Sequence, residues 1–417
     1  MLNDRKVIAV NCQSKFVLGI LDRMLQPLAE RGWTLVCVTT MLSVCWRARR
    51  KGIHCLLVKD GKPRYSYSGL DVKNTKEFLL NHSDEEKLNR FQSSVLSTLE
   101  NLSKKEWPSA VIVWNGMDAC NQAILAFAKR NGVPTVFFEL GNIDSKLFVD
   151  PEGVNAASRV ARYPEILDRW KISEEEFLDW LNSFQLRQLK TSAPPQARTS
   201  RTINYFYPLD RVGMALWRIP QPFIMPLYKK IFSKLQTHQI MVAPAIKPEL
   251  PYVFLPLQVS ADTNLILLSD CDNIKAIEIA ERHAKKLACV LVVKTHPAET
   301  NQGIIRNITS ICKERGHLLT SLNTTELIRG AMGVVTINST VGLEAMLYGK
   351  EVKILGRSIY SGFSDNQARA YVLRYLVDFN PFGTSTMTLA ALDRILKFLG
   401  ESKNERVPPL DHISQHS

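Results

Sequence analysis

The chain of 417 residues is 45% hydrophobic and 22% charged, a composition typical of a globular protein long enough for two domains. No apolar run is long enough to cross a bilayer, and the start of the chain lacks the apolar core and cleavage site of a signal peptide, which argues against export by the general secretory route. The formal net charge of +13 indicates an anionic partner: nucleic acid, anionic lipid or an acidic glycan.

Apolar, β-branched runs alternate with amphipathic helical segments along the first part of the chain. The predicted strands are residues 6–10, 33–38, 54–58, 110–114 and 135–138. The predicted helices are residues 15–31, 43–51, 84–103, 118–130 and 174–189. Strands that alternate with helices indicate a parallel sheet covered on both faces.

The alternation stops at residues 187–249, which are rich in proline, arginine and aromatic side chains, and then resumes. The later strands are predicted at residues 252–257, 288–293, 317–320, 333–337 and 351–355. The later helices are predicted at residues 273–287, 303–315, 340–348, 367–375 and 388–399. We therefore predict an α/β protein with a GT-B-like fold, in which two Rossmann-like domains, 1–186 and 250–403, face a cleft and 404–417 form a flexible tail.

Several function classes lose their sequence support. The chain contains no GxxxxGK[ST] element, no GxGxxG after the first strand and no GxSxG elbow, which disfavours P-loop NTPases, dinucleotide-dependent oxidoreductases and α/β-hydrolases. Its eight cysteines form no CxxC pair and lie mostly in apolar runs, as buried thiols in a reducing cytoplasm would. No cluster has metal-ligand spacing, so we expect neither a metal nor a cofactor.

The positive charge is concentrated at residues 187–234, where nine basic residues face one acidic residue, Asp210. Aromatic residues lie among them: Tyr205, Phe206, Tyr207, Trp217, Phe223 and Tyr228. This combination predicts peripheral attachment to the anionic inner face of the cytoplasmic membrane. The alternative is an inter-domain connector whose aromatic side chains pack on the core. Nucleic acid is not favoured as the partner, because prolines interrupt the stretch and no nucleic-acid-binding motif accompanies it.

Two motifs in the second half of the chain follow predicted strands and introduce anion-binding chemistry. Lys294 and His296 follow one strand, and Ser339 and Thr340 follow another at the start of a helix. A helix N-terminus presents unpaired backbone N–H groups, and ligands gather at the carboxyl ends of parallel strands. Together the motifs predict a nucleotide or nucleotide-sugar site. Each has a structural alternative, since Ser-Thr can serve only as a helix cap and a lone histidine is often structural.

Further motifs precede these in the chain. They are Val113-Trp114-Asn115-Gly116, Phe138-Glu139-Leu140-Gly141-Asn142, Phe148-Val149-Asp150-Pro151-Glu152-Gly153-Val154-Asn155 and Leu255-Pro256-Leu257-Gln258-Val259-Ser260-Ala261-Asp262. In this order, and followed by residues 294–297 and 338–345, the set resembles bacterial capsule polysaccharide β-Kdo transferases of the KpsS/KpsC type. The resemblance covers about 111–160 and 252–362, and the length fits the single-module, KpsS-like type.

The resemblance implies a retaining transferase that uses CMP-Kdo as donor and adds Kdo to a phosphatidylglycerol-type lipid, with the second domain binding the CMP-sugar and the first the acceptor. By the same resemblance, Asp262 is the nucleophile and Glu139 the base that deprotonates the acceptor. His296 is the third catalytic residue and stabilises the leaving phosphate. A capsule assembly complex is a further possible partner.

The resemblance also extends to binding residues. The predicted donor-binding residues are Lys294, His296, Asn338, Ser339, Thr340, Gly342, Glu344 and Gln258. The predicted acceptor-side residues are Asn115, Asn142 and Asn155. Alternatives stay open at two of these positions: Glu344 can be a first-turn acid that stabilises the helix dipole, and Gly342 can serve helix packing alone. Alternatives also stay open for the two catalytic carboxylates, since Asp262 can cap a turn and Glu139 can pair with a basic residue.

Two other functions compete with a β-Kdo transferase. One is a GT-B transferase that uses another CMP-sugar, such as a sialic acid. The other is a non-catalytic capsule assembly or export factor, which the presence of Glu139, Asp262 and His296 disfavours.

Overall fold

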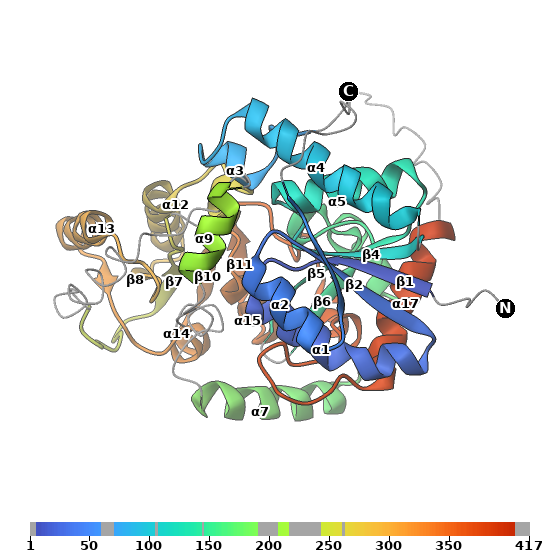
Figure 1. The fold of residues 1–417 in the computed structure, drawn as a ribbon. Helices are drawn as coiled ribbons and strands as arrows, with labels where there is room; N and C mark the ends of the chain where they lie inside the picture. The colour runs from blue at the N-terminus through green and yellow to red at the C-terminus, as the bar shows by residue number, and fades with distance from the viewer. Residues whose placement is uncertain are drawn as a thin grey trace, which may run out of the picture.

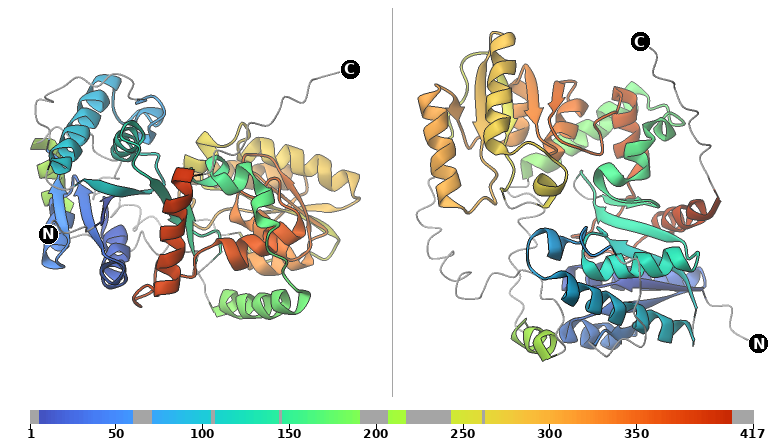
Figure 2. Two further views of the ribbon diagram at one scale, coloured as in Figure 1. Left: turned by 90° about the vertical axis from the view of Figure 1, so that its right-hand side faces the viewer. Right: turned by 90° about the horizontal axis from the view of Figure 1, so that it is seen from above.

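A computed structural model of the chain describes residues 6–59, 71–104, 107–143, 146–190, 207–216, 243–260 and 263–404. Two α/β lobes lie side by side, each built around its own sheet (Figures 1 and 2). The predicted fold class, α/β with two Rossmann-like domains, is confirmed.

The first sheet has six strands in the order β3-β2-β1-β4-β5-β6. Its strands are β1 (Lys6–Asn11), β2 (Trp33–Thr39), β3 (His54–Leu57), β4 (Pro108–Trp114), β5 (Thr135–Leu140) and β6 (Leu147–Asp150). The first five are parallel, whereas β6 runs antiparallel to β5 and was not predicted. The accompanying helices are α1 (Lys15–Glu30), α2 (Leu42–Arg50), α3 (Lys76–Leu79), α4 (Glu85–Ser103) and α5 (Ala119–Arg130).

The second sheet has five parallel strands in the order β11-β10-β7-β8-β9. Its strands are β7 (Tyr252–Pro256), β8 (Val290–Lys294), β9 (Leu318–Leu319), β10 (Gly333–Thr336) and β11 (Glu351–Ile354). Its helices are α11 (Thr263–Leu267), α12 (Asn273–Lys286), α13 (Gln302–Glu314), α14 (Thr324–Gly330) and α15 (Thr340–Leu347). When the strands are numbered within each domain, both sheets contain the order 3-2-1-4-5. The strand order reverses between the first and fourth strands, and folds of this kind bind ligands at this reversal point.

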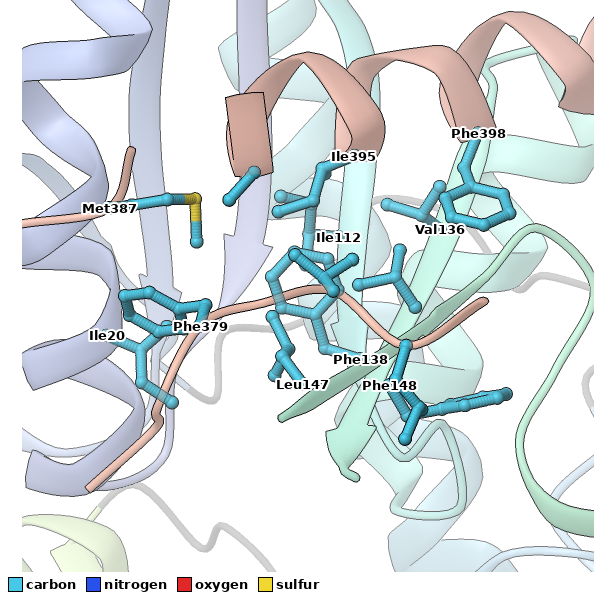
Figure 3. Packing of buried hydrophobic residues seen from close by; sticks show 14 of the residues in the cluster. Ile20, Ile112, Val136, Phe138, Leu147, Phe148, Phe379, Met387, Ile395 and Phe398 are labelled. Atoms are coloured by element: carbon cyan, nitrogen blue, oxygen red, sulfur yellow. The ribbon is translucent and has the colours of Figure 1, made fainter. Parts of the chain in front are cut away.

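Segments near the end of each domain pack on the other domain. The remaining elements are η1 (Asn155–Ala157), α6 (Arg159–Arg162), η2 (Pro164–Leu167), α7 (Glu174–Lys190), α9 (Tyr207–Leu216), α16 (Asp365–Ala370), η4 (Tyr371–Tyr375) and α17 (Leu389–Asn404). Helix α17 contacts β5, β6 and α1, and Figure 3 shows Ile395 and Phe398 of α17 beside Val136. In return, α7 makes ion pairs with α16 and η4 through Glu174–Arg369 and Glu176–Arg374.

The predicted boundaries therefore need a correction. The sequence assigned residues 250–403 to one domain, but α17 completes the core of the first sheet. Its apolar residues, which include Leu392, Ile395 and Phe398, lie in the same buried cluster as Ile112 and Phe138. Helical periodicity gives the buried face of a helix but not the sheet that this face covers.

Helix α9 lies in the predicted membrane-facing stretch and packs on α2. Both carboxylate oxygens of Asp210 accept hydrogen bonds from Ser43, one from its backbone N–H (2.8 Å) and one from its hydroxyl (2.5 Å), and Met214 is buried beside them. The opposite side of α9 exposes Leu209 (58%), Val212 (58%) and Leu216 (74%). Most of the stretch, at 191–206 and 217–242, lies outside the described residues, as does the predicted tail from 405 onward.

Candidate functional site

The reversal point of the second sheet brings together two residues that the sequence predicted for donor binding. Gln258 follows β7 and Asn338 follows β10. The Gln258 amide donates from Nε2 to Asn338 Oδ1 (2.8 Å) and accepts at Oε1 from the Asn338 backbone N–H (3.3 Å). Asn273, at the start of α12, pairs with the Gln258 backbone N–H (3.1 Å) and carbonyl (2.8 Å). The pair is thereby fixed where a ligand is expected in this fold.

Helix α15 begins directly after this pair. The Ser339 hydroxyl accepts from the Val341 backbone N–H (3.3 Å), so Ser339 is the N-cap. The first turn contains no acidic residue, and Thr340, the first helical residue, is partly exposed. The helix end therefore presents a neutral cap and the positive end of its dipole, which favours a bound anion.

Two residues that the sequence analysis left without a role hold Ser339 in place. The Tyr360 hydroxyl donates to the Ser339 carbonyl, and the Ser339 backbone N–H donates to Thr336 Oγ1 (3.3 Å). Gly342 makes this approach possible, because a Cβ there would lie 2.8 Å from Thr336 Cγ2 and against the Tyr360 hydroxyl. The packing explanation for Gly342 thus accounts for the residue.

Glu344 lies one turn into α15. It is not in the first turn, so the explanation that it stabilises the helix dipole is wrong. Burial of its carboxyl group raises the pKa of Glu344 to about 7. A half-protonated carboxyl near neutral pH can both donate and accept a hydrogen bond, as an interaction with a ribose hydroxyl requires.

The loop after β8 carries His296. Its Nδ1 accepts from the backbone N–H of Ala298 (3.1 Å), which leaves the proton of the neutral ring on Nε2. The same loop contains Glu299, which is buried and was not predicted. Glu299 accepts from the backbone N–H groups of Thr300 (2.9 Å), Asn301 (2.9 Å) and, on the loop after β7, Ser260 (2.8 Å).

Glu299 therefore fastens the histidine loop to the segment that leads to Asp262. Burial raises the pKa of Glu299, but the hydrogen bonds from Ser260, Asn301 and Thr300 outweigh this effect, and the pKa lies below its ordinary value. Asp262 itself lies outside the described residues, two positions after Ser260. The only sequence signal for Glu299 was its place three residues after His296.

Lys294 is engaged elsewhere. Its ammonium group donates to the Leu322 carbonyl (2.6 Å) and to Thr324 Oγ1 (2.9 Å) at the start of α14, and burial lowers the pKa of the group. The charged end of Lys294 therefore stabilises the β9–α14 connection, and its part in donor binding stays a prediction.

The first domain contributes Glu139, near the end of β5. Its Oε2 accepts from Asn115 Nδ2 (2.5 Å), and its Oε1 accepts from the Leu140 backbone N–H (2.9 Å). Asn115 and Gly116 both adopt the left-handed conformation, with φ of 63° and 86°, which turns the chain sharply after β4. Both carboxylate oxygens of Glu139 are thereby oriented, and the hydrogen bond places Asn115, a predicted acceptor-side residue, directly against Glu139.

The other two acceptor-side asparagines have different surroundings. Asn142 Oδ1 accepts from the Tyr371 hydroxyl (2.5 Å), which ties the loop after Glu139 to η4. Asn155 is also left-handed (φ 52°), and its carbonyl accepts from the backbone N–H (3.1 Å) and hydroxyl (2.6 Å) of Ser158.

Asp150 organises the loop that contains Asn155. Its fully buried carboxylate accepts from Tyr375 Oη (2.8 Å) and from backbone N–H groups of residues 152, 153, 159 and 160. Within the described ranges no group of three or more His, Cys, Asp or Glu side chains could hold a metal ion.

Comparison with known proteins gives the family. The model of the family described as "Capsule polysaccharide biosynthesis protein" matches residues 109–372, well over half of the chain. The chain belongs to this family, which confirms the resemblance drawn from the motifs.

Individual relatives are more distant. "Protein FixF" of Sinorhizobium fredii is 29% identical over 63% of this chain and 52% of its own length. "Capsule polysaccharide export protein KpsS" of Escherichia coli is 25% identical over 56% of this chain and 63% of its own length. The chain thus covers less than two thirds of either relative. Among solved structures, the β-Kdo 2,7 transferase of Thermosulfurimonas dismutans KpsC is 14% identical with a TM-score of 0.41, over 95% of this chain and 100% of that one.

Proposed function

We propose that the chain is a retaining β-Kdo glycosyltransferase of capsule biosynthesis, which transfers Kdo from CMP-Kdo to a phosphatidylglycerol-type lipid at the cytoplasmic face of the membrane. Membership of the capsule family and the likeness to KpsS support the pathway. One observation carries the proposal. The N-terminus of α15 has no acidic residue in its first turn, and it lies beside the Gln258–Asn338 pair at the reversal point of the second sheet.

The donor phosphate binds at the start of α15. The hydroxyls of Ser339 and Thr340 and the Thr340 backbone N–H are donors on one side, and His296 Nε2–H is the donor from the loop after β8. Glu344 accepts from the ribose hydroxyls, and the Gln258 amide lines the site. As the bond to CMP breaks, negative charge develops on the phosphate, and oriented donors stabilise it without reorganisation.

The chemistry proceeds by two displacements at the anomeric carbon. The Asp262 carboxylate attacks this carbon and expels CMP, which leaves with the bonding electron pair. Glu139 then takes the proton of the acceptor hydroxyl, and the resulting oxygen nucleophile displaces Asp262 from the sugar. Two inversions give net retention. Asn115 and the Leu140 backbone N–H orient Glu139 for proton transfer.

The enzyme reaches its lipid acceptor through α9. The outward face of α9 is apolar, while Arg211 lies on the same helix and α2 ends in Arg47, Arg49 and Arg50. Apolar side chains enter the headgroup region and each basic residue contributes about 1 kcal/mol near an anionic surface. No helix in the described ranges is long and apolar enough to span the membrane.

Sedimentation with phosphatidylglycerol vesicles tests this attachment. Leu216→Glu should reduce binding at low salt, whereas Leu186→Glu, which alters an exposed leucine on α7 (61%), should not. Replacement of Arg198, Arg201, Arg211 and Arg218 by Ala should remove the salt-sensitive part of vesicle binding. Equal binding of all variants would exclude α9 and this stretch as the membrane contact.

The transferase proposal is tested by CMP release. The protein is incubated with CMP-Kdo or CMP-sialic acid, with and without a phosphatidylglycerol-type acceptor, and the lipid product is analysed by mass spectrometry. We expect acceptor-dependent CMP release with CMP-Kdo and a β-linked Kdo-lipid. Release from CMP-sialic acid alone would identify a different donor, and no release from either would favour a non-catalytic capsule factor.

A further inference from the structure

A hollow lies on the first domain between α17 and the segment around η2. One part has a volume of about 190 Å³ and is lined by Arg159, Glu165, Ile166, Arg169, Tyr375, Phe398 and Glu401. An adjoining part of about 350 Å³ shares Arg169, Phe398 and Glu401 and adds Trp170, Asp393, Arg394 and Lys397. None of these residues is a predicted catalytic, donor-binding or acceptor-side residue, although Tyr375 and the Arg159 backbone also hold Asp150.

The acidic residues of this hollow are largely neutralised by partners of their own. Arg31 donates to both carboxylate oxygens of Asp393 (2.6 Å each). Arg159 pairs with Glu401 (3.3 Å). Of the acids that line the hollow, only Glu165, which is exposed, has no basic partner in the described part of the chain.

The basic residues are in the opposite situation. Arg169, Arg394 and Lys397 have no acidic partner within 4.0 Å among the described residues; Arg169 lies over the Trp170 ring, 4.1 Å from its centroid. Arg394 is partly buried, and burial lowers its pKa; Tyr375 and Asp378 raise it, whereas the charges of Arg169 and Arg374 lower it further. Like charges that gather around a partly buried guanidinium oppose folding unless an anion joins them.

We infer that this hollow is a binding site for a phosphate ester, with Arg169, Arg394 and Lys397 around the phosphate and Trp170 and Phe398 against the group that it carries. Guanidinium groups match phosphate oxygens with paired donors, and a lysine adds a point charge. The aromatic walls give the esterified group an apolar surface to cover. The inference is independent of the proposed transferase, because it uses none of its residues.

A site-specific signal is available from Trp170, one of seven tryptophans. The protein is labelled with 5-fluorotryptophan, and the Trp170 resonance is assigned by its loss in Trp170→Phe. Inorganic phosphate is then titrated against chloride at constant ionic strength. Two further arms, glycerol phosphate and phosphatidylglycerol vesicles, distinguish a soluble ester from a lipid headgroup. We expect a saturable shift of Trp170 with phosphate and a tighter response to one of the two esters.

The variants Arg394→Gln and Lys397→Gln should each weaken this response at least about fivefold, as expected for loss of a charge-assisted hydrogen bond. Arg306→Gln, an exposed arginine on α13, is the matched control and should titrate like the unaltered protein. A Trp170 signal that does not respond to phosphate, or one that responds equally in Arg394→Gln and Arg306→Gln, would overturn the site. Neither outcome bears on CMP release.

Discussion

The two domains share a strand order but differ in charge at equivalent helix ends. In the first sheet, α5 follows the fourth strand and begins with Asp118, whose carboxylate accepts from the Asn121 backbone N–H (2.9 Å), while Glu77 accepts from the Ala119 backbone N–H (2.9 Å). In the second sheet, α15 follows the fourth strand, is capped by the neutral Ser339 and has no acid in its first turn.

This difference indicates which domain can hold a phosphate. The N-terminus of α5 already interacts with two carboxyl groups, and burial followed by the charge of Asp118 raises the pKa of Glu77 to about 7. A phosphate there would meet further negative charge. At α15 the same helix-end geometry is available to an external anion. The fold supplies two equivalent positions, and we propose that the donor binds at the one with the neutral cap.

The largest effect is expected at Asp262, in the loop after the first strand of the second sheet. Asp262→Ala should reduce transfer at least about 10³-fold, because the nucleophile is lost, while CMP affinity stays near normal. Turnover and CMP calorimetry on the same preparation measure both quantities. Near-normal turnover would exclude the double displacement.

Glu139→Gln tests whether the two domains contribute to different chemical steps. Since the proposed role of Glu139 lies only in the second step, the variant should accumulate a Kdo–enzyme adduct, detected by intact-protein mass spectrometry. An unmodified protein with normal product formation would contradict this role. Asp262→Ala provides the control, because it cannot form the adduct.

The histidine loop should affect donor binding through one hydrogen bond. His296→Ala should weaken CMP binding by roughly 1.5–3 kcal/mol, the usual contribution of a hydrogen bond to a charged group. Calorimetry measures the change. The variant Lys294→Ala tests whether Lys294 binds the donor: because its ammonium group is bonded to Leu322 and Thr324, CMP affinity should change less than in His296→Ala, and the reverse order would support a role for Lys294 in donor binding.

We expect Glu299 to position the histidine loop and Ser260 rather than to bind substrate. Glu299→Gln retains the size of the side chain but loses the charge that holds Ser260 and the histidine loop together. We expect kcat to fall about tenfold, as for a small displacement of reacting groups, with little change in KM. The exposed Glu351→Gln is the control. A change confined to KM would assign Glu299 to substrate binding instead.

Glu344 gives the smallest effect, a dependence of stability on pH. Because its folded pKa is raised to about 7, the folded state retains a proton that the unfolded state has lost, and stability falls as the pH rises from about 4.5 to about 7. Glu344→Gln removes this dependence. The Tm of the variant relative to the unaltered protein should therefore rise by a few degrees from pH 5 to pH 8. A constant difference would show that the carboxyl group is solvated.

Local patterns were sufficient to predict much of the fold. Apolar runs identified the parallel strands, and Ser339 was recognised as a helix cap from its place before an apolar helix. Strand β6 was missed because its four residues, 147–150, are buried on both faces and show no alternation. The domain assignment of α17 was missed because the choice between two apolar sheets depends on tertiary packing.

Candidate site residues at strand ends could be singled out from the sequence, whereas residues that act through another loop could not. Glu139, Gln258 and Asn338 lie at strand ends, and the structure shows hydrogen bonds that fix each of them. Glu299 and Tyr360 act on Ser260 and Ser339, which are far from them in sequence. The bonds of Lys294 to Leu322 and Thr324 were not foreseen, because a strand-end residue can turn toward either neighbouring strand.

The most direct test of the comparison places a carboxylate at the N-cap of α15, as Asp118 does at α5. Ser339→Asp and Ser339→Asn both preserve capping, since Asp and Asn are equally good N-caps, and they differ only in charge. CMP affinity is measured by calorimetry for both, with Asp118→Asn as the mirror variant in the first domain. We predict that Ser339→Asp weakens CMP binding at least about tenfold relative to Ser339→Asn and that Asp118→Asn leaves it unchanged. Equal affinity of the two Ser339 variants would contradict phosphate binding at this helix end.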